Sequence, residues 1–457
     1  MGSGRGHRSL SFLDDSREDV SRGARAVVVY PAFRSRAGNG GRGGVIDPEA
    51  RLEEARGLAL AIGLVVTDAF TIPIREARAG TLFGEGQISN IAVACNQHDA
   101  ELVIVDGSLT AIQQRNLEDQ LKRKVIDRTG LILEIFGERA ATAEGRLQVE
   151  LAHLDYQAGR LVRSWTHLER QRGGFGFLGG PGETQIEADR RMIRDRMAKL
   201  RRELDQVRRT RGLHRSRREK APWPVIALVG YTNAGKSTLF NRITGAAVMA
   251  EDLLFATLDP TMRAIRLPGM DKAIMSDTVG FISDLPTQLV AAFRATLEEV
   301  TAADVVVHVR DIANPDSAAQ RAEVLHVLTG LDLIDEESGL STVPIIEAWN
   351  KWDLVSEDRR AELLAIIATR PEEKIVPVSA ITGAGCADLL DTISGVLTAG
   401  AKVHSFAIPL SDGQRIAWLH ANGEVIEEAD VDGDERGPLR KLKVRLAPRD
   451  LGRFSRL

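Results

Sequence analysis

Eight consecutive residues, Gly230 to Ser237, have the composition and spacing of a loop that binds a polyphosphate. They read GYTNAGKS, which fits the pattern GxxxxGK[ST], and they lie between the apolar run Val225 to Val229 and a helix-forming stretch. Glycines let backbone N–H groups wrap phosphate oxygens, and a helix N-terminus adds its dipole. Lys236 adds a positive charge, and Ser237 offers a hydroxyl ligand to Mg²⁺. The predicted phosphate contacts are Gly230, Tyr231, Thr232, Asn233, Ala234, Gly235, Lys236 and Ser237.

A second motif, Asp277 to Gly280 (DTVG), ends the strand-like run 273–276. Its aspartate can reach the ligand shell of Mg²⁺, and the N–H of its glycine can meet a γ-phosphate. We therefore expect Lys236 and Gly280 to act at the transferred phosphate. The predicted nucleotide contacts of this motif are Asp277, Thr278, Val279 and Gly280.

Two further motifs predict which base the nucleotide carries. Asn350 to Asp353 (NKWD) follows an apolar run, and the carboxylate of Asp353 can accept two hydrogen bonds from guanine N1 and N2, which adenine does not offer. After the run 375–378, a backbone N–H can meet guanine O6. Each short motif alone is a common polar loop, but four in this order, each ending a strand, predict a guanine-nucleotide hydrolase. The predicted base contacts are Asn350, Lys351, Trp352, Asp353, Ser379, Ala380 and Ile381.

Phe281 stands where Ras-like proteins carry a glutamine that orients the attacking water. Because a phenyl ring cannot hydrogen-bond a water, we expect slow hydrolysis by the isolated chain and activation by a partner or a cation. Asn233 suggests K⁺, since GxxNxGKS is similar to the loop of GTPases that bind K⁺ beside the phosphates, where the ion replaces an arginine finger. An ordinary turn-forming asparagine is the alternative.

Composition limits the architecture and the environment. A chain of 457 residues is too long for one core, and its length predicts about three or four domains. Cys95 and Cys386 lie far apart without metal-ligand spacing, which fits a reducing cytosol. Apolar runs stay shorter than the roughly 18 residues that span a bilayer. Residues 1–24 lack the apolar core of a signal peptide and should form a disordered tail. We expect a cytoplasmic protein, with peripheral association to a membrane left open.

Positive charge is concentrated in one segment. The chain carries a net charge of −4, yet residues 190–220 hold 14 Lys and Arg against four Asp and Glu, so the remainder carries −14. Such a segment on an acidic protein predicts a polyanionic partner that is met at one place. A solvated charged helix face is the alternative.

Residues 25–137 alternate short apolar runs with helical patterns, which predicts a small, largely parallel α/β sheet. The expected strands are 26–30, 64–67, 101–105 and 124–126, and the expected helices are 48–62, 87–96 and 109–121. Between Arg34 and Gly44 the sequence RSRAGNGGRGG cannot pack, so we expect a mobile loop there. Contact of its three arginines with RNA is the alternative.

Residues 138–221 predict a helical hairpin. Two helices carry apolar side chains with 4-3-4-3 spacing, so they should pair antiparallel along one seam, with the basic residues of the second helix on its other faces. The intervening segment 172–182 holds six glycines and two phenylalanines, which suggests a tip that inserts between nucleotide bases. A plain flexible connector is the alternative. The seam residues are Leu147, Leu151, Leu154, Ala158 and Leu161 in the first helix, and Ile193, Met197, Leu200, Leu204 and Val207 in the second.

The nucleotide motifs lie in residues 222–398, where Leu289, Phe293, Leu297 and Val300 form the core-facing stripe of one helix. Residues 399–457 predict a small α+β domain whose sequence identifies no function. The expected fold is therefore α/β. A P-loop GTPase domain is preceded by a small parallel α/β domain and an antiparallel helical hairpin, and is followed by the α+β domain.

Past its N-terminal tail, the chain resembles the HflX family of translational GTPases. This resemblance implies that Phe255, Ala256, Thr257, Leu258 and Asp259 belong to switch I. It also implies that the Thr257 hydroxyl joins Ser237 on Mg²⁺ when a γ-phosphate is present. The chain departs from the family in its longer hairpin tip and in the glycine-rich loop 38–44. The segments that carry the resemblance are QQRNLEDQL (113–121), DRTGLILEIF (127–136), EGRLQVELAHL (144–154), GPGETQIEADRR (180–191), GYTNAGKSTLFN (230–241), LFATLDPT (254–261) and DTVGFISDLP (277–286).

The resemblance further implies a GTP-hydrolysing switch that binds the large ribosomal subunit and its RNA, with the hairpin reaching toward the peptidyl-transferase region. Such a protein splits or rescues stalled or stressed ribosomes. Some members are linked to heat stress or antibiotic resistance, and some bind ATP through the N-terminal region. We expect a monomer in which GTP and Mg²⁺ order Thr257 and Gly280. The alternatives are a GTPase switch on free structured RNA, and a nucleotide-gated factor that silences ribosomes without turnover.

Overall fold

The computed structural model describes only part of the chain, and some predictions fall outside that part. These are the tail before residue 22, the loop 34–44, the hairpin tip, Thr257 with its neighbours Ala256, Leu258 and Asp259, and the stripe residues Leu289 and Phe293. The described residues are 22–33, 47–140, 142–171, 190–207, 223–246, 254–255, 261–283, 297, 299–399, 402–431, 438–446, 451 and 454–455.

A four-stranded parallel sheet forms the N-terminal domain, with strand order β2-β1-β3-β4. Strand β2 is longer than the apolar run 64–67 predicted. It lies at the sheet edge and its second half alternates polar and apolar residues, so the sequence shows no continuous apolar run there. The elements are β1 (Arg25–Phe33), α2 (Pro48–Ala61), β2 (Val65–Ile74), α3 (Glu85–Gln97), β3 (Leu102–Val105), α4 (Ala111–Leu121) and β4 (Lys124–Asp127).

Helix α5 (Arg128–Arg139) follows β4 directly and was not predicted. The Asp127 side chain caps it by accepting a hydrogen bond from the N–H of Gly130 at 2.8 Å. Seven of its residues are buried, on every side of the helix, because it packs between other elements. An apolar pattern without a polar face gives no helical period, and this explains why the sequence did not reveal α5.

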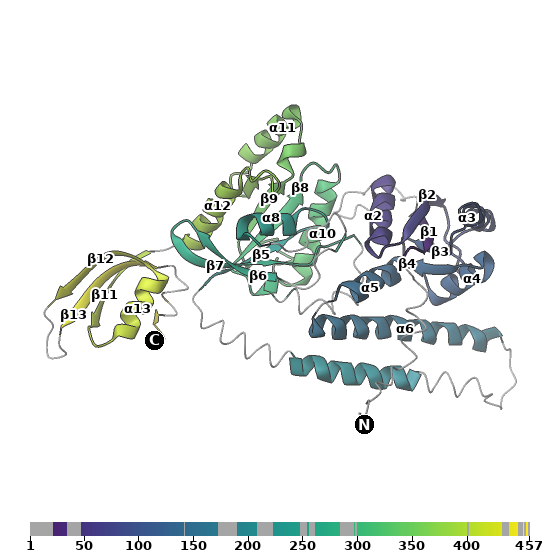
Figure 1. Cartoon of the computed structure of the whole chain (residues 1–457), viewed down its shortest axis with the longest axis horizontal. Helices are drawn as coiled ribbons and strands as arrows, with labels where there is room; N and C mark the ends of the chain where they lie inside the picture. Colours follow the sequence, from purple (N-terminus) through teal and green to yellow (C-terminus); the bar gives the residue numbers. More distant parts are fainter. Residues whose placement is uncertain are drawn as a thin grey trace, which may run out of the picture.

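The hairpin consists of α6 (Ala143–Gln171) and a second helix at residues 190–207, which lie side by side in Figure 1. The predicted apolar seam is present, with Leu154, Met197 and Leu200 buried together. Arg196 of the second helix forms an ion pair with Glu150 of α6 at 2.5 Å, beside the seam. The spacing of the apolar residues therefore predicted the pairing of these helices correctly.

The GTPase domain contains a six-stranded sheet in the order β10-β9-β8-β5-β7-β6, in which only β6 is antiparallel to its neighbour. Helices lie on both of its faces (Figure 1). Its strands are β5 (Val225–Val229), β6 (Thr261–Leu267), β7 (Met270–Asp277), β8 (Val305–Asp311), β9 (Ile345–Asn350) and β10 (Lys374–Pro377). Its helices include α8 (Lys236–Thr244), α10 (Ser317–Gly330), the 3₁₀ helix η1 (Trp352–Leu354), α11 (Glu357–Ala368) and α12 (Cys386–Thr398).

One apolar core crosses from the N-terminal domain into the GTPase domain. It includes Phe136 of α5 together with Phe255 and Phe281 of the GTPase domain, and the rings of Phe136 and Phe255 meet edge to face at 4.7 Å. The two domains therefore share buried surface instead of touching only through polar side chains.

The last domain is an antiparallel sheet, β11-β13-β12, with helix α13 packed on it. Figure 1 shows it at the end of the molecule away from the N-terminal sheet. In the described part of the chain, none of the helices combines the length and the apolar character needed to cross a membrane. The elements are β11 (Lys402–Pro409), α13 (Gly413–Asn422), β12 (Glu424–Val431) and β13 (Leu439–Leu446).

Candidate nucleotide site

The four sequence motifs meet at one edge of the six-stranded sheet. They follow β5, β7, β9 and β10, which all run parallel, so their carboxyl ends share that edge. This is where open α/β sheets bind their ligands.

The phosphate loop has the backbone that its glycines predict. Gly235 has φ of +90°, and a Cβ there would collide with the side-chain amide of Asn350. The buried Lys236 donates from Nζ to the carbonyls of Gly230 at 3.1 Å and Tyr231 at 2.8 Å. Burial lowers the pKa of Lys236 to about 8, and the charge of Asp277 opposes this shift only in part.

Two oxygen atoms suited as ligands of Mg²⁺ lie side by side. The Ser237 hydroxyl donates to the Asp277 carboxylate at 2.7 Å, so one hydroxyl from the phosphate loop and one carboxylate from the end of β7 face the same place. Magnesium prefers such oxygen ligands together with phosphate oxygens. These residues fit the ion and would hold it, and the predicted third ligand, Thr257, lies outside the described residues.

The motif DTVG and the residue after it (277–281), which we call the switch II motif, are paired with the phosphate loop through their backbone. Thr232 N–H donates to the carbonyl of Phe281 at 2.7 Å, and Phe281 N–H donates to the carbonyl of Gly230 at 3.1 Å. Gly280 has no room for a Cβ because Thr232 and Lys236 lie against it. The Phe281 side chain is only 1% exposed, so its ring packs in the core away from the phosphates. Neither chemistry nor position allows this side chain to orient water.

The other residues of this motif brace the strand end. Thr278 donates from its hydroxyl to the carbonyl of Leu228 at 2.6 Å, and Val279 lies in the core. Both side chains therefore point away from the nucleotide, which leaves the backbone of the motif and the Asp277 carboxylate to face it.

Asn350 joins the base-recognition motif to the phosphate loop. Its side-chain amide donates to the carbonyl of Ala234 at 2.8 Å and accepts from the N–H of Ala380 at 3.0 Å. Lys351 forms an ion pair with Asp311 at 2.9 Å, while Asp353 remains exposed and accessible to a base. One side chain thus holds together three of the loops that the sequence predicted separately.

The loop after β10 is held by its own hydrogen bonds and by α8. Ser379 accepts at its hydroxyl from the N–H of Thr382 at 3.1 Å. Arg242 of α8 donates to the carbonyls of Ala380 and Ile381. The sequence did not indicate this role for Arg242, because an arginine on a helix carries no signal of the loop it contacts.

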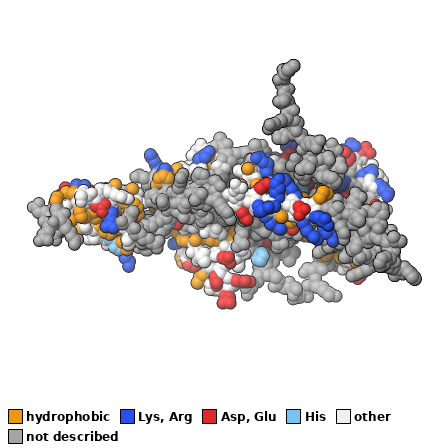
Figure 2. Space-filling model, turned by 90° about the horizontal axis from the view of Figure 1, so that it is seen from below, with side chains coloured by type: hydrophobic (Ala, Val, Ile, Leu, Met, Phe, Trp, Pro, Cys, Tyr) orange, Lys and Arg blue, Asp and Glu red, His pale blue; other side chains and the backbone are white. Residues whose placement is uncertain are grey.

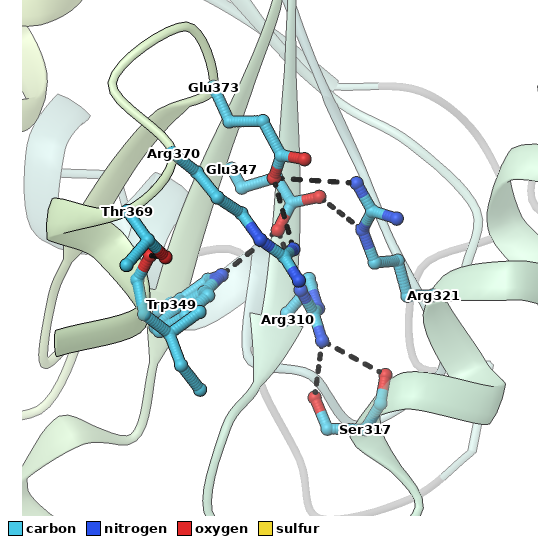
Figure 3. Close-up of polar contacts among 9 residues, drawn as sticks. Arg310, Ser317, Arg321, Glu347, Trp349, Thr369, Arg370 and Glu373 are labelled. Atoms are coloured by element: carbon cyan, nitrogen blue, oxygen red, sulfur yellow. Dashed lines mark hydrogen bonds and ion pairs between the residues drawn. The ribbon is translucent and has the colours of Figure 1, made fainter. Parts of the chain in front are cut away.

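A buried ionic cluster supports the strand that ends in Asn350. Glu347 of β9 receives Arg310 at 2.6 Å, Arg321 at 2.5 Å and the Trp349 indole at 2.9 Å, and Figure 3 shows these groups converging on its carboxylate. Burial would raise the pKa of Glu347, but Arg310 and the other positive charges lower it to about 2. Glu347 is therefore ionised at neutral pH, and its contacts fix β9 just before the guanine motif.

Three predicted residues other than glycine adopt positive φ, and one of them is Lys351 with φ of 60°. Asn233 has φ of 58°, which asparagine tolerates better than most residues, and Phe255 also has φ of 58°. The Phe255 ring is buried against Phe136, so this residue, predicted to belong to switch I, is anchored on the N-terminal domain by its side chain.

A basic surface lies on the second hairpin helix. Residues 190–207 hold seven Lys and Arg against three Asp and Glu, and Figure 2 shows Lys and Arg side chains gathered on the face seen from the hairpin side. Arg191, Arg194 and Arg201 are exposed, and none of them has an acidic partner among the residues that the structure describes. We call these three residues the basic face.

Comparisons with known proteins agree with this architecture. The family models GTP-binding GTPase N-terminal, GTP-binding GTPase Middle Region and 50S ribosome-binding GTPase match residues 49–137, 139–218 and 225–351. The chain is 46% identical over 405 residues to the GTPase HflX of Magnetococcus marinus, covering 88% of this chain and 90% of the relative. It is 42% identical over 363 residues to the GTPase HflX of Escherichia coli K12, with 79% and 83% covered. For the GTPase HflX of Caldanaerobacter subterraneus the identity is 41% over 433 residues, with 95% and 94% covered. Because these matches span the N-terminal domain, the hairpin and a complete set of guanine-nucleotide motifs, the chain belongs to the HflX family of GTPases and hydrolyses GTP.

Proposed function

We propose that this GTPase binds the large ribosomal subunit in its GTP form and splits, rescues or silences stalled or stressed ribosomes. The observation that carries the proposal is the basic face, three exposed arginines without acidic partners among the described residues of an otherwise acidic chain. Ribosomal RNA is the polyanion that such a surface fits, since each arginine that neutralises a phosphate releases a counterion. The match to the 50S ribosome-binding GTPase model supports the same partner.

The nucleotide site supplies the switch for this binding. In the proposed cycle, Ser237, Asp277 and Thr257 would hold Mg²⁺, which would supply neutralisation of phosphate charge, while Lys236 and the N–H of Gly280 would contact the γ-phosphate. Asp353 selects guanine. Since Phe281 is buried in the core, the ribosome supplies the alignment of water that the chain lacks.

Three finer points belong to the same proposal. K⁺ binds beside Asn233, and the protein acts as a monomer. ATP binds in the N-terminal domain, at an open surface pocket that Arg75 and Arg78 help to line.

Sedimentation tests the proposal directly. We expect the full chain with a non-hydrolysable GTP analogue to sediment with large subunits, and GTP turnover to rise with ribosomes but not with naked structured RNA. Acceleration by naked RNA alone would favour the switch on free RNA. Binding without any acceleration would favour a silencing factor that does not turn over.

A triple variant tests the basic face. Arg191→Gln, Arg194→Gln and Arg201→Gln together should weaken subunit binding and flatten its salt dependence, by up to about 0.9 in logarithmic slope for each phosphate that is no longer neutralised. The matched control changes three exposed arginines that have acidic partners on their own helices, Arg56, Arg115 and Arg359. Equal salt slopes in the two triple variants would contradict the assignment.

A further inference from the structure

A buried group of polar side chains joins the N-terminal domain to the phosphate loop and switch II. It comprises Glu54 of α2, Asp106 after β3 and Arg128 at the start of α5, which meet Tyr231 of the phosphate loop and Ser283 of the segment after the switch II motif. We call these five residues the interdomain network. Glu54, Asp106 and Arg128 belong to none of the nucleotide motifs.

The network holds Ser283 by both of its backbone groups. The N–H of Ser283 donates to the Tyr231 hydroxyl at 2.8 Å, and Arg128 donates to the carbonyl of Ser283 at 2.9 Å. Glu54 ties these contacts together, because its carboxylate accepts from both the Tyr231 hydroxyl and the Arg128 guanidinium. Asp106 accepts from the other terminal nitrogen of Arg128.

These polar groups are buried, so they depend on one another for their hydrogen bonds. The side chains of Arg128 and Asp106 are 4% and 1% exposed, and Ser283 and Tyr231 are also buried. Burial and the charge of Glu54 raise the pKa of Tyr231, so its hydroxyl stays protonated and donates at any physiological pH. If one partner is removed, a buried charged group is left partly without hydrogen bonds. The free-energy cost of this is larger than the stabilisation that a surface hydrogen bond provides.

Ser283 lies three residues after Gly280, whose N–H is the expected contact of the γ-phosphate. Between them, Phe281 is bridged to the phosphate loop at Tyr231. Before Gly280, the Thr278 hydroxyl fixes the chain to the carbonyl of Leu228, and after Gly280 the backbone is fixed at Phe281 and Ser283, so Gly280 has little freedom. We propose that Glu54 and Arg128 are positioning residues for GTP hydrolysis, which hold Tyr231 and Ser283 and thereby keep switch II against the phosphate loop.

A matched pair of tyrosine variants tests this proposal in the full-length chain. Tyr231→Phe removes the hydroxyl that meets Glu54 and Ser283. Tyr156→Phe removes a hydroxyl that is also mostly buried and donates to a carboxylate, that of Asp127, at 2.6 Å, but does not touch switch II. Tyr231→Phe should slow single-turnover hydrolysis by about tenfold, the usual effect of removing a hydrogen bond to a charged group. It should also lower the affinity for a GTP analogue relative to GDP, while Tyr156→Phe leaves both within about twofold of the parent.

The ratio of GTP-analogue to GDP affinity separates positioning from mere support of the fold, because GDP lacks the phosphate that switch II meets. Equal effects of the two tyrosine variants on rate and ratio would overturn the proposal.

Glu54→Gln keeps the test decisive if Tyr231→Phe loses thermal stability. This change lies in α2, outside the GTPase domain, and its control is Glu53→Gln at the exposed neighbouring residue that pairs with Arg56. We expect Glu54→Gln, but not Glu53→Gln, to slow hydrolysis at least about fivefold and to lower the affinity ratio. Hydrolysis rates and ratios that match in these two variants would show that the network does not position switch II.

Discussion

The pKa of Lys236 can be tested directly, because burial in the fold lowers it toward neutral pH. Its amino group must be protonated to attract phosphate, yet burial lowers its pKa from 10.5 to about 8. Bound phosphate favours the charged form, so binding above pH 8 must take up a proton. GDP affinity should therefore be level up to about pH 7.5 and then decrease, by up to about tenfold per pH unit. Fluorescence titration from pH 7 to 9 measures this, and a level affinity would contradict the argument.

Asp353 is the residue predicted to select the base. Its loop is fixed by Asn350 and by the hydrogen bond from Trp352 N–H to the carbonyl of Val378 at 3.2 Å, so the carboxylate has a defined place. Asp353→Asn should reduce GTP affinity by about tenfold or more and gain affinity for xanthosine triphosphate, whose C2 oxygen accepts a hydrogen bond from the asparagine amide where guanine has a donor. Asp358→Asn, at an exposed position in α11, is the control. Unchanged selectivity in competition binding would show that the base is read elsewhere.

Among the elements, α5 connects the hairpin to the GTPase domain. Asp127, its cap, accepts from Tyr156 at 2.6 Å and from Arg160 at 2.8 Å, and both of these residues lie on α6. The next residue, Arg128, reaches Ser283 of the GTPase domain. Adjacent residues at the start of α5 therefore contact the hairpin on one side and the GTPase domain on the other.

The hairpin seam should be separable from the nucleotide site. Leu200 is fully buried in that seam, so Leu200→Ala should destabilise the pairing of the hairpin helices by about 2–5 kcal/mol. Met192 of the same helix is 51% exposed, and Met192→Ala should change it by less than about 0.5 kcal/mol. Hydrogen exchange across residues 143–171 and 190–207 measures the destabilisation, while GTP binding should persist. Equal exchange in the two variants would contradict the seam.

For the whole molecule, the buried ring of Phe281 predicts a GTPase that requires an activator for fast hydrolysis. Hydrolysis by the chain alone should be slow, with a rate constant of about 10⁻⁴ to 10⁻² per second, as in GTPases that lack an activator. Large ribosomal subunits should accelerate it, and K⁺ should exceed Na⁺ if Asn233 helps to bind the ion. Phosphate release measured in matched K⁺ and Na⁺ buffers, with and without subunits, tests both points. A fast basal rate that subunits leave unchanged would contradict the activation argument, and equal rates in the two salts would remove only the cation.

The sequence by itself determined the nucleotide, the order of the elements around it and the seam of the hairpin. These features are local, since a phosphate loop occupies eight consecutive residues and a helical seam repeats within one helix. Only the tertiary structure revealed α5, whose burial on every side removed its period, and the place of the Phe281 ring in the core. The meeting of Glu54 with Tyr231, 177 residues later in the chain, was equally hidden. Contacts between residues so far apart leave no periodic pattern in either segment, because the two side chains come together only when the chain folds.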